Sequence, residues 1–152
     1  LAFKDYENIG FTTAYEELNE DINNNTYGML KTDPEMSGIT NTKEALSKYA
    51  WDKYYCDEDT FKEAIYKTIN EHKYAVSDTI AQMNADDISR QHDIETLPGQ
   101  RTSFFKFTKI IRYTPQEGKR YSLLSENCQA FVQRVVNRYL SLEKRFIKEE
   151  KL

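Results

Sequence analysis

The chain is poor in the residues that build loop-rich or cross-linked scaffolds. Its 152 residues include only two cysteines, three prolines and five glycines, which disfavours a disulfide-stapled fold and suits helices and ordinary strands. No apolar run approaches the roughly 20 residues that span a bilayer, so we expect no membrane-spanning helix. Aromatic residues make up 13% of the chain, which is typical of a chain that folds around a core. We therefore predict a single domain over residues 1–152.

An excess of basic charge is also missing, since the formal net charge is −4. Affinity for nucleic acid comes largely from neutralising phosphates, so this charge disfavours nucleic acid as a partner. The basic residues between 106 and 120 fit the solvated side of a strand and turn. The sequence contains no zinc-type Cys/His spacing, no calcium-loop pattern and no phosphate-cradling glycine loop, so we expect neither a metal nor a cofactor.

Apolar periodicity predicts that most of the helices come early in the chain. Residues 21–42 are rich in turn-favouring types and read as a loop, after which Thr42 can cap a helix. Apolar side chains then recur every three or four positions across residues 60–84, which predicts one long helix with its acidic start at residues 57–59. Asn84-Ala85-Asp86-Asp87 is expected to end that helix.

The second half of the chain predicts strands followed by a helix. Residues 88–114 are expected to form a small antiparallel sheet, with Thr102–Thr114 as its best strand because of its aromatic and β-branched residues. A turn is expected at residues 115–118. Residues 126–148 carry an amphipathic stripe and predict a long C-terminal helix. The order of helices, a small sheet and a helix indicates an α+β fold.

Cys128 is the residue that most resembles a reactive group. Ser125 or Asn127 can cap the C-terminal helix, which places Cys128 in its first turn. The positive end of the helix dipole favours a thiolate there, and cysteines at such positions often have lowered pKa values. A small hydrophobe at the head of the buried stripe is the competing interpretation.

Thiol catalysis also needs a proton acceptor, and the chain has only two histidines. His72 falls on the apolar stripe of the long helix, where a packed histidine is the simpler interpretation. His92 falls in the segment expected to be a strand, and a strand histidine that faces a helix N-terminus is a workable general base. The competing interpretation of His92 is a surface histidine in a polar loop. If the chain is a thiol enzyme, Cys128, Asn127 and His92 are the catalytic set that we expect.

The stretch Tyr121–Val132 resembles a segment of the permuted papain-like thiol proteins, in which the pattern is Y-x-L-L-x-x-N-C-x-x-F. That group includes lecithin:retinol acyltransferase-like acyltransferases and relatives of NlpC-type cell-wall peptidases. The resemblance implies that Cys128 is the nucleophile and that a preceding strand histidine, here His92, is its base. It also implies that the Asn-Cys pair opens a helix that packs on a small antiparallel sheet. The surroundings of His92 lack the family's glycine and aromatic residues.

Two other functions remain open from the sequence. A Cys56–Cys128 disulfide would stabilise a non-enzymatic secreted effector or toxin-type module that binds a protein partner. The sequon at Asn24–Thr26 and the start at Leu1 rather than methionine favour secretion slightly and suggest a processed or trimmed chain. A histidine-dependent ribonuclease toxin, with arginines such as Arg112 near a histidine, is the second alternative.

Overall fold

The computed structural model describes residues 1, 8–15, 26–32, 54–96, 107–142 and 147–148. Within these residues the fold is α+β, as predicted, with helices and two small antiparallel sheets. The elements are β1 (Gly10–Thr13), β2 (Thr26–Lys31), β3 (Tyr54–Tyr55), α2 (Glu58–His72), α3 (Asp78–Thr96), β4 (Arg120–Tyr121), α4 (Cys128–Ser141) and β5 (Ile147–Lys148). None of the described helices has the length and apolar character needed to cross a membrane.

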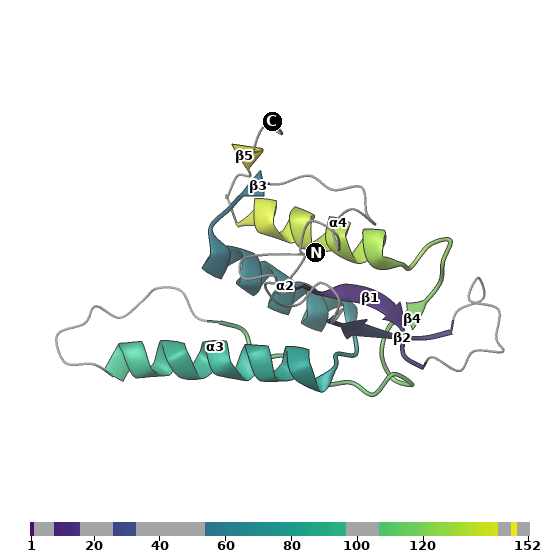
Figure 1. Cartoon of the computed structure of the whole chain (residues 1–152), viewed down its shortest axis with the longest axis horizontal. Helices are drawn as coiled ribbons and strands as arrows, with labels where there is room; N and C mark the ends of the chain where they lie inside the picture. Colours follow the sequence, from purple (N-terminus) through teal and green to yellow (C-terminus); the bar gives the residue numbers. More distant parts are fainter. Residues whose placement is uncertain (2–7, 16–25, 33–53, 97–106, 143–146, 149–152) are drawn as a thin grey trace, which may run out of the picture.

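The three described helices lie side by side, with α2 between α4 and α3 (Figure 1). α4 runs antiparallel to α2, because the Asp57 backbone N–H before α2 donates to the Tyr139 hydroxyl near the end of α4, at 3.1 Å. α3 also runs antiparallel to α2, since Arg90 late in α3 approaches Asp59 early in α2. Because α2 is covered on two sides, most of its middle residues are buried.

The larger sheet has the order β1-β2-β4 and lies at the end of the helical stack where α2 ends and α3 begins (Figure 1). Phe11 of β1 packs edge-on against Tyr74, with ring centroids 4.9 Å apart, and thereby joins the sheet to the helical core. Gly28 of β2 is required for this packing. A Cβ at position 28 would come within 2.3 Å of the Phe11 ring, so only glycine leaves room for it.

The prediction of one helix over residues 60–84 is wrong, because α2 ends at His72. Lys73 has a left-handed φ of 56°, and its N–H donates to the Asn70 carbonyl at 3.4 Å. The next N–H, that of Tyr74, donates to the Ile69 carbonyl at 3.0 Å, which completes a Schellman-type helix end. The predicted start of this helix at residues 57–59 is confirmed.

Residues 74–77 leave the helical pattern because they pair with the sheet. The Leu30 N–H in β2 donates to the Ala75 carbonyl at 2.8 Å, and the Ser77 N–H donates to the Leu30 carbonyl at 2.9 Å. Val76, which the helical spacing assigned to the long helix, therefore forms a parallel bridge with Leu30 instead. Tertiary pairing with β2 outweighs the helical spacing of these apolar side chains.

α3 continues well past residues 84–87, where the predicted long helix was expected to end. Ser77 caps it, since the Ile80 N–H donates to the Ser77 hydroxyl at 3.4 Å. Asn84 and Asp87, which were expected to stop the helix, are buried and bond inward from α3. The expected strand in residues 88–97 is therefore wrong wherever the chain is described, because α3 extends to Thr96.

The strand predicted for Thr102–Thr114 is also absent from its described part, residues 107–114. The backbone of residues 107–111 bonds to side chains of α2 and α3, not to another strand, and residues 102–106 lie outside the described residues. The following turn at residues 115–118 is confirmed, since the Gly118 N–H donates to the Thr114 carbonyl at 2.9 Å. The small sheet thus comes mainly from residues 10–31, part of which was expected to be a loop.

α4 confirms the predicted C-terminal helix but is shorter, because it ends at Ser141. The predicted stripe is buried at Phe131, Val135 and Tyr139, which pack toward α2. Residues 147–148 form β5, which pairs with β3 and does not continue the helix. The helix expected from Thr42 lies outside the described residues.

The left-handed residue at the end of α2 allows a stability test. Lys73→Gly should increase the free energy of unfolding by roughly 1 kcal/mol, because glycine adopts a positive φ without the Cβ clash of lysine. Urea unfolding followed by circular dichroism measures this change. The matched control is Lys67→Gly in the middle of α2, which should instead lower the free energy of unfolding by about 1 kcal/mol. Equal destabilisation by both variants would contradict the assigned helix end.

Candidate thiol site at the start of α4

Cys128 is the first residue of α4, as the sequence predicted. Asn127 before it has an extended backbone, and its side-chain oxygen accepts from the Ala130 N–H at 3.1 Å. The same amide donates to the Leu123 carbonyl at 2.9 Å, so Asn127 also fixes the preceding turn. Of the two predicted caps, Asn127 and not Ser125 holds the helix start.

A closed turn leads from β4 into α4. The Ser122 N–H donates to the Glu126 carbonyl at 2.8 Å, and the Glu126 N–H donates back to the Ser122 carbonyl at 3.0 Å. Leu124 lies at the tip of this turn and is 81% exposed. Cys128 itself is half-buried, and its Sγ lies 3.5 Å from where a Cβ on Gly10 of β1 would stand. The thiol therefore packs beside the backbone of β1.

Arg134 organises the polar groups around this helix start. Its guanidinium donates to both carboxylate oxygens of Glu126, at 2.6 and 2.8 Å, and to the Tyr74 hydroxyl at 2.6 Å. The hydrogen bond from Arg134 lowers the pKa of Glu126, and Glu126 in turn raises the pKa of Arg134. Burial raises the pKa of Tyr74, and Cys128 lies close enough to raise that pKa further. One arginine thus links α4, the turn before it and the segment after α2.

His72 lies at the edge of this network and is half-buried. Burial lowers its pKa below the ordinary value of 6.5, and the positive charges of Arg134 and Lys119 lower it further. Nearby carboxylates oppose this effect, with Glu71 ahead of Glu126. At neutral pH the imidazole is therefore mainly uncharged, which is the form that can accept a proton.

His92 is not on a strand, because it lies within α3. Its side chain lies outside what the structure describes, but its place along α3 sets it apart from Cys128. Arg90, two residues before it, approaches Asp59 at the start of α2, whereas Cys128 lies near Tyr74, after the end of α2. α2 rises by roughly 20 Å between these ends. The structure does not bring Cys128 and His92 together, since α4 and α3, which carry them, lie on opposite sides of α2 (Figure 1).

The Cys56–Cys128 disulfide of the alternative function is not formed, because both cysteines are free. Cys56 precedes Asp57, whose N–H bonds to Tyr139, while Cys128 begins the same helix at its other end. α4 rises by roughly 16 Å between Cys128 and Tyr139, which explains why the two thiols do not meet. Burial, and then the charges of Asp57 and Glu58, raise the pKa of the Cys56 thiol.

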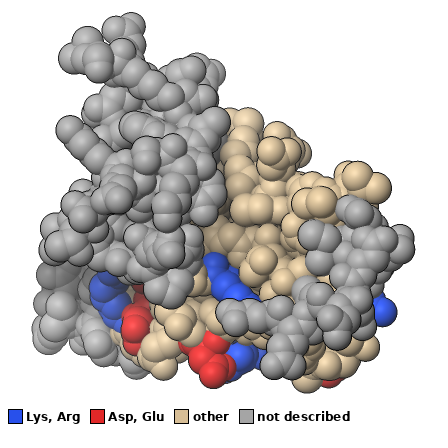
Figure 2. Space-filling view, turned by 45° about the vertical axis from the view of Figure 1, so that its right-hand side comes forward, with Lys and Arg blue, Asp and Glu red and all other residues tan. Residues whose placement is uncertain are grey.

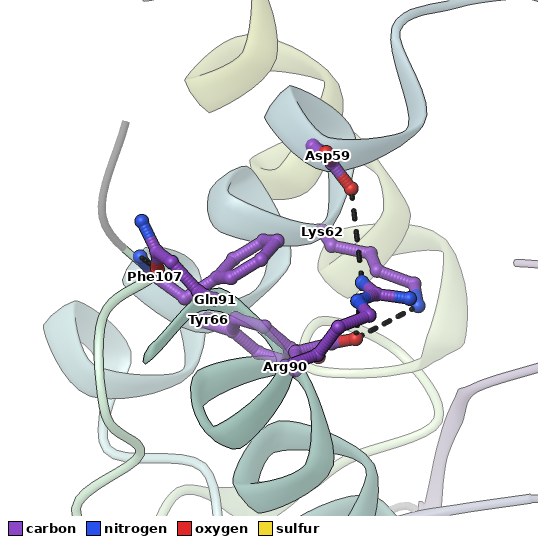
Figure 3. Close-up of polar contacts among 7 residues, drawn as sticks. Asp59, Lys62, Tyr66, Arg90, Gln91 and Phe107 are labelled. Carbon is purple, nitrogen blue, oxygen red and sulfur yellow. Dashed lines mark hydrogen bonds and ion pairs between the residues drawn. The ribbon is translucent and has the colours of Figure 1, made fainter. Parts of the chain in front are cut away.

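A second polar cluster joins α2 to α3 and was missed from the sequence. The buried Asp87 carboxylate accepts from Lys62 at 3.3 Å, from Arg90 at 2.9 Å and, over a short contact, from the Tyr66 hydroxyl. Arg90 also reaches Asp59 at 4.0 Å (Figure 3). The sequence did contain a signal for this cluster. Asp87 lies at helical spacing from Ile80 and therefore on the inward face of the helix. The burial of this cluster fits a structural link between helices.

Basic residues do not form a separate patch on the described surface. Arg112 pairs with Asp78 at 2.9 Å, and Lys119 lies 3.9 Å from Glu126. On the face in Figure 2, several of the Lys and Arg side chains lie beside Asp and Glu side chains. Arg112 is not among the groups that act on His72. Among the described residues no group of three or more His, Cys, Asp or Glu side chains could hold a metal ion.

Comparison of the chain with models of protein families, with curated proteins and with solved structures found no match. The resemblance of Tyr121–Val132 to permuted papain-like proteins therefore stays a prediction. Two local features agree with what it implies, since Asn127 and Cys128 open a helix and α4 contacts β1 of an antiparallel sheet. The expected strand histidine is not found on the described strands.

The bond between Glu126 and Arg134 predicts a pH dependence of stability. Because the pKa of Glu126 is lowered from 4.5 in the folded protein, its ionised form stabilises the fold above that pH. This contribution is lost as the pH falls through the lowered pKa. Glu126→Gln should therefore reduce the free energy of unfolding near neutral pH and have little effect in strong acid. Urea unfolding across this pH range measures the difference.

Glu117→Gln is the matched control, because within the described part of the chain Glu117 accepts from the Thr114 hydroxyl, at 2.7 Å, and lies outside the Arg134 network. It removes the same charge without removing an arginine partner. The prediction is contradicted if the two variants lose the same stability at every pH.

Proposed function

We propose that the start of α4 is the thiol site of a hydrolase or acyltransferase, with Cys128 as the nucleophile. The observation that carries this proposal is the position of Cys128 as the first residue of a helix, directly after a capping asparagine. N–H groups in a first turn have no partner within the helix, and the helix dipole is positive there. The thiolate is the form that attacks an acyl group, so this position suits a nucleophilic cysteine.

His72 takes the role of general base in this proposal, in place of His92. Its ring centroid lies 6.4 Å from that of Tyr74, and Cys128 acts electrostatically on the same tyrosine. Both residues are therefore connected to Tyr74, while Cys128 is not among the groups that act on the charge of His72. The lowered pKa of His72 keeps its imidazole ready to accept a proton at neutral pH.

The proposed chemistry uses the two side chains in turn. The Cys128 sulfur attacks the carbonyl carbon of an ester or amide, and the thiol proton passes to His72 and then to the departing alcohol or amine. The backbone N–H of Cys128 is a donor suited to the oxyanion, because it belongs to the first turn. Water then releases the acid in a hydrolase, whereas a second alcohol or amine accepts the acyl group in a transferase. Asn127 holds the helix start in position.

The two alternative functions have less support. The secreted interaction module was based mainly on a Cys56–Cys128 disulfide, and both thiols are free. The ribonuclease required a histidine beside arginines such as Arg112, but Arg112 bonds to Asp78 and to the Val76 carbonyl. The thiol site is therefore the function that the geometry favours.

Acylation by p-nitrophenyl acetate tests the nucleophile. At pH 7, Cys128 should gain an acetyl group at least about 10-fold faster than Cys56, although Cys56 is the more exposed, because the pKa of Cys56 is raised. Mass spectrometry of proteolytic fragments measures both rates in one sample. Cys128→Ala should abolish the faster reaction and Cys56→Ser should leave it intact. Equal rates at the two cysteines would rule out an activated Cys128.

Matched histidine variants test the base. The acylation rate at Cys128 should fall as the pH drops through the lowered pKa of His72, because protonation removes the acceptor. His72→Gln should lower the rate at neutral pH by roughly 10²-fold or more and remove this inflection, whereas His92→Gln should change neither. The role of His72 is refuted if the two variants show the same profile.

A further inference from the structure

Residues 107–111 lie between α2 and α3 and are bonded by side chains of both helices. Asn84 of α3 donates to the Thr108 carbonyl at 2.9 Å and accepts from the Ile110 N–H at 3.0 Å. Asn70 of α2 donates to the Lys109 carbonyl at 3.0 Å and accepts from the Ile111 N–H at 2.8 Å. We call the surface formed by these two amides, Glu63 and Gln91 the α2–α3 groove.

Each asparagine bonds the same pair of backbone groups in the segment. It bonds the carbonyl of one residue and the N–H of the residue two positions later, which are the groups that a neighbouring β-strand would use. The two amides come from different helices and address alternate residues of the segment. None of residues 108–111 pairs with a described backbone group. The groove therefore supplies, from side chains, what a strand would supply on both sides of an extended peptide.

The groove also contains a buried carboxylate that needs a backbone donor. Glu63 is 3% exposed, and both of its oxygens accept from the single N–H of Thr108, at 2.8 and 3.1 Å. Asn84 is equally buried. If the segment left without replacement, these groups would lose their partners and bear their full desolvation cost. Replacement by another extended backbone would keep the same bonds.

The side chains of the segment show which residues the groove selects. Ile110 is buried in the core, and Phe107 packs edge-on against Tyr66 with ring centroids 6.0 Å apart (Figure 3). Lys109 and Ile111 point outward, and Ile111 is 53% exposed. Gln91 accepts from the Phe107 N–H at 2.8 Å, which fixes the first residue. The contacts thus require an extended backbone with an aromatic residue first and a β-branched aliphatic residue fourth.

We propose that the α2–α3 groove binds an extended peptide of a partner protein, and that Phe107–Ile111 is the built-in occupant that such a peptide displaces. Recognition of extended peptides through main-chain bonds, with pockets for selected side chains, is a general mode of binding. The tethered segment competes at an effective concentration on the order of millimolar, so a partner peptide binds best when this segment is weakened. This site is separate from the proposed thiol site and does not depend on it.

Peptide binding tests the proposal directly. The probe is a fluorescent peptide of sequence KFTKIIRY, which is that of residues 106–113, and fluorescence anisotropy measures its binding. Ile110→Ala in the full chain weakens the built-in occupant, so the peptide should bind this variant at least about 10-fold more tightly than the unaltered protein. Adding Asn70→Ala to Ile110→Ala should reduce the affinity again, because it removes two backbone bonds.

A matched peptide shows whether the backbone is what is recognised. N-methylation at the position of Ile110 removes the N–H that Asn84 accepts and leaves the side chain unchanged. This peptide should bind at least about 10-fold more weakly. Equal binding of the two peptides, or no saturable binding to an Ile110→Ala chain with native circular dichroism, would overturn the proposal.

Hydrogen exchange on the unaltered chain covers the case in which Ile110→Ala does not fold. The amides of Thr108, Ile110 and Ile111 should exchange at least about 100-fold faster than those of Ile65 and Ile69 in α2, because the segment leaves its groove without global unfolding. Excess KFTKIIRY peptide should leave the α2 amides protected. If all five amides exchange at one common rate, the segment departs only when the protein unfolds, and the proposal fails.

Discussion

The left-handed turn at Lys73 is the constraint on which the rest of the fold depends. It ends α2 and sends Tyr74 into the core, where that ring meets Phe11 of β1 and Phe131 of α4. The next residues pair with β2, and Ser77 then starts α3 in the opposite direction. A continuous helix would have carried these side chains past the sheet, so one turn determines how the sheet and the helices share a core.

The geometry of the candidate thiol site depends on the same turn. Tyr74 is fully buried, and its hydroxyl receives its bond from Arg134, which also binds Glu126 just before Cys128. Because a buried hydroxyl needs a partner, this arginine ties the start of α4 to the end of α2. The charges of Arg134 and Glu126 also act on His72. The site is thus assembled around a structural ion pair and not around His92, which the expected strand and the family resemblance had indicated.

Residues 107–111, which follow α3, show that composition can predict an extended backbone without predicting the groups that bond to it. Its aromatic and β-branched residues predicted an extended backbone, but a propensity does not specify the partner that satisfies that backbone. In the fold, Asn70 and Asn84 take the place of neighbouring strands. Asn84, which looked like a helix-ending signal, therefore helps Asn70 to hold an extended segment between two helices. That arrangement is the basis for a peptide-binding groove.

What the sequence determined by itself was local: the acidic start of α2, a polar cap at Ser125 or Asn127, the buried stripe of α4 and the turn at residues 115–118. These depend on neighbours within a few positions, so capping chemistry and apolar spacing were enough. The tertiary structure decided the break at Lys73, the strands at residues 10–31, the length of α3 and the separation of Cys128 from Cys56 and His92. Each of these depends on backbone partners or burial supplied by distant segments, because pairing with β2 and packing against α2 outweigh local preference.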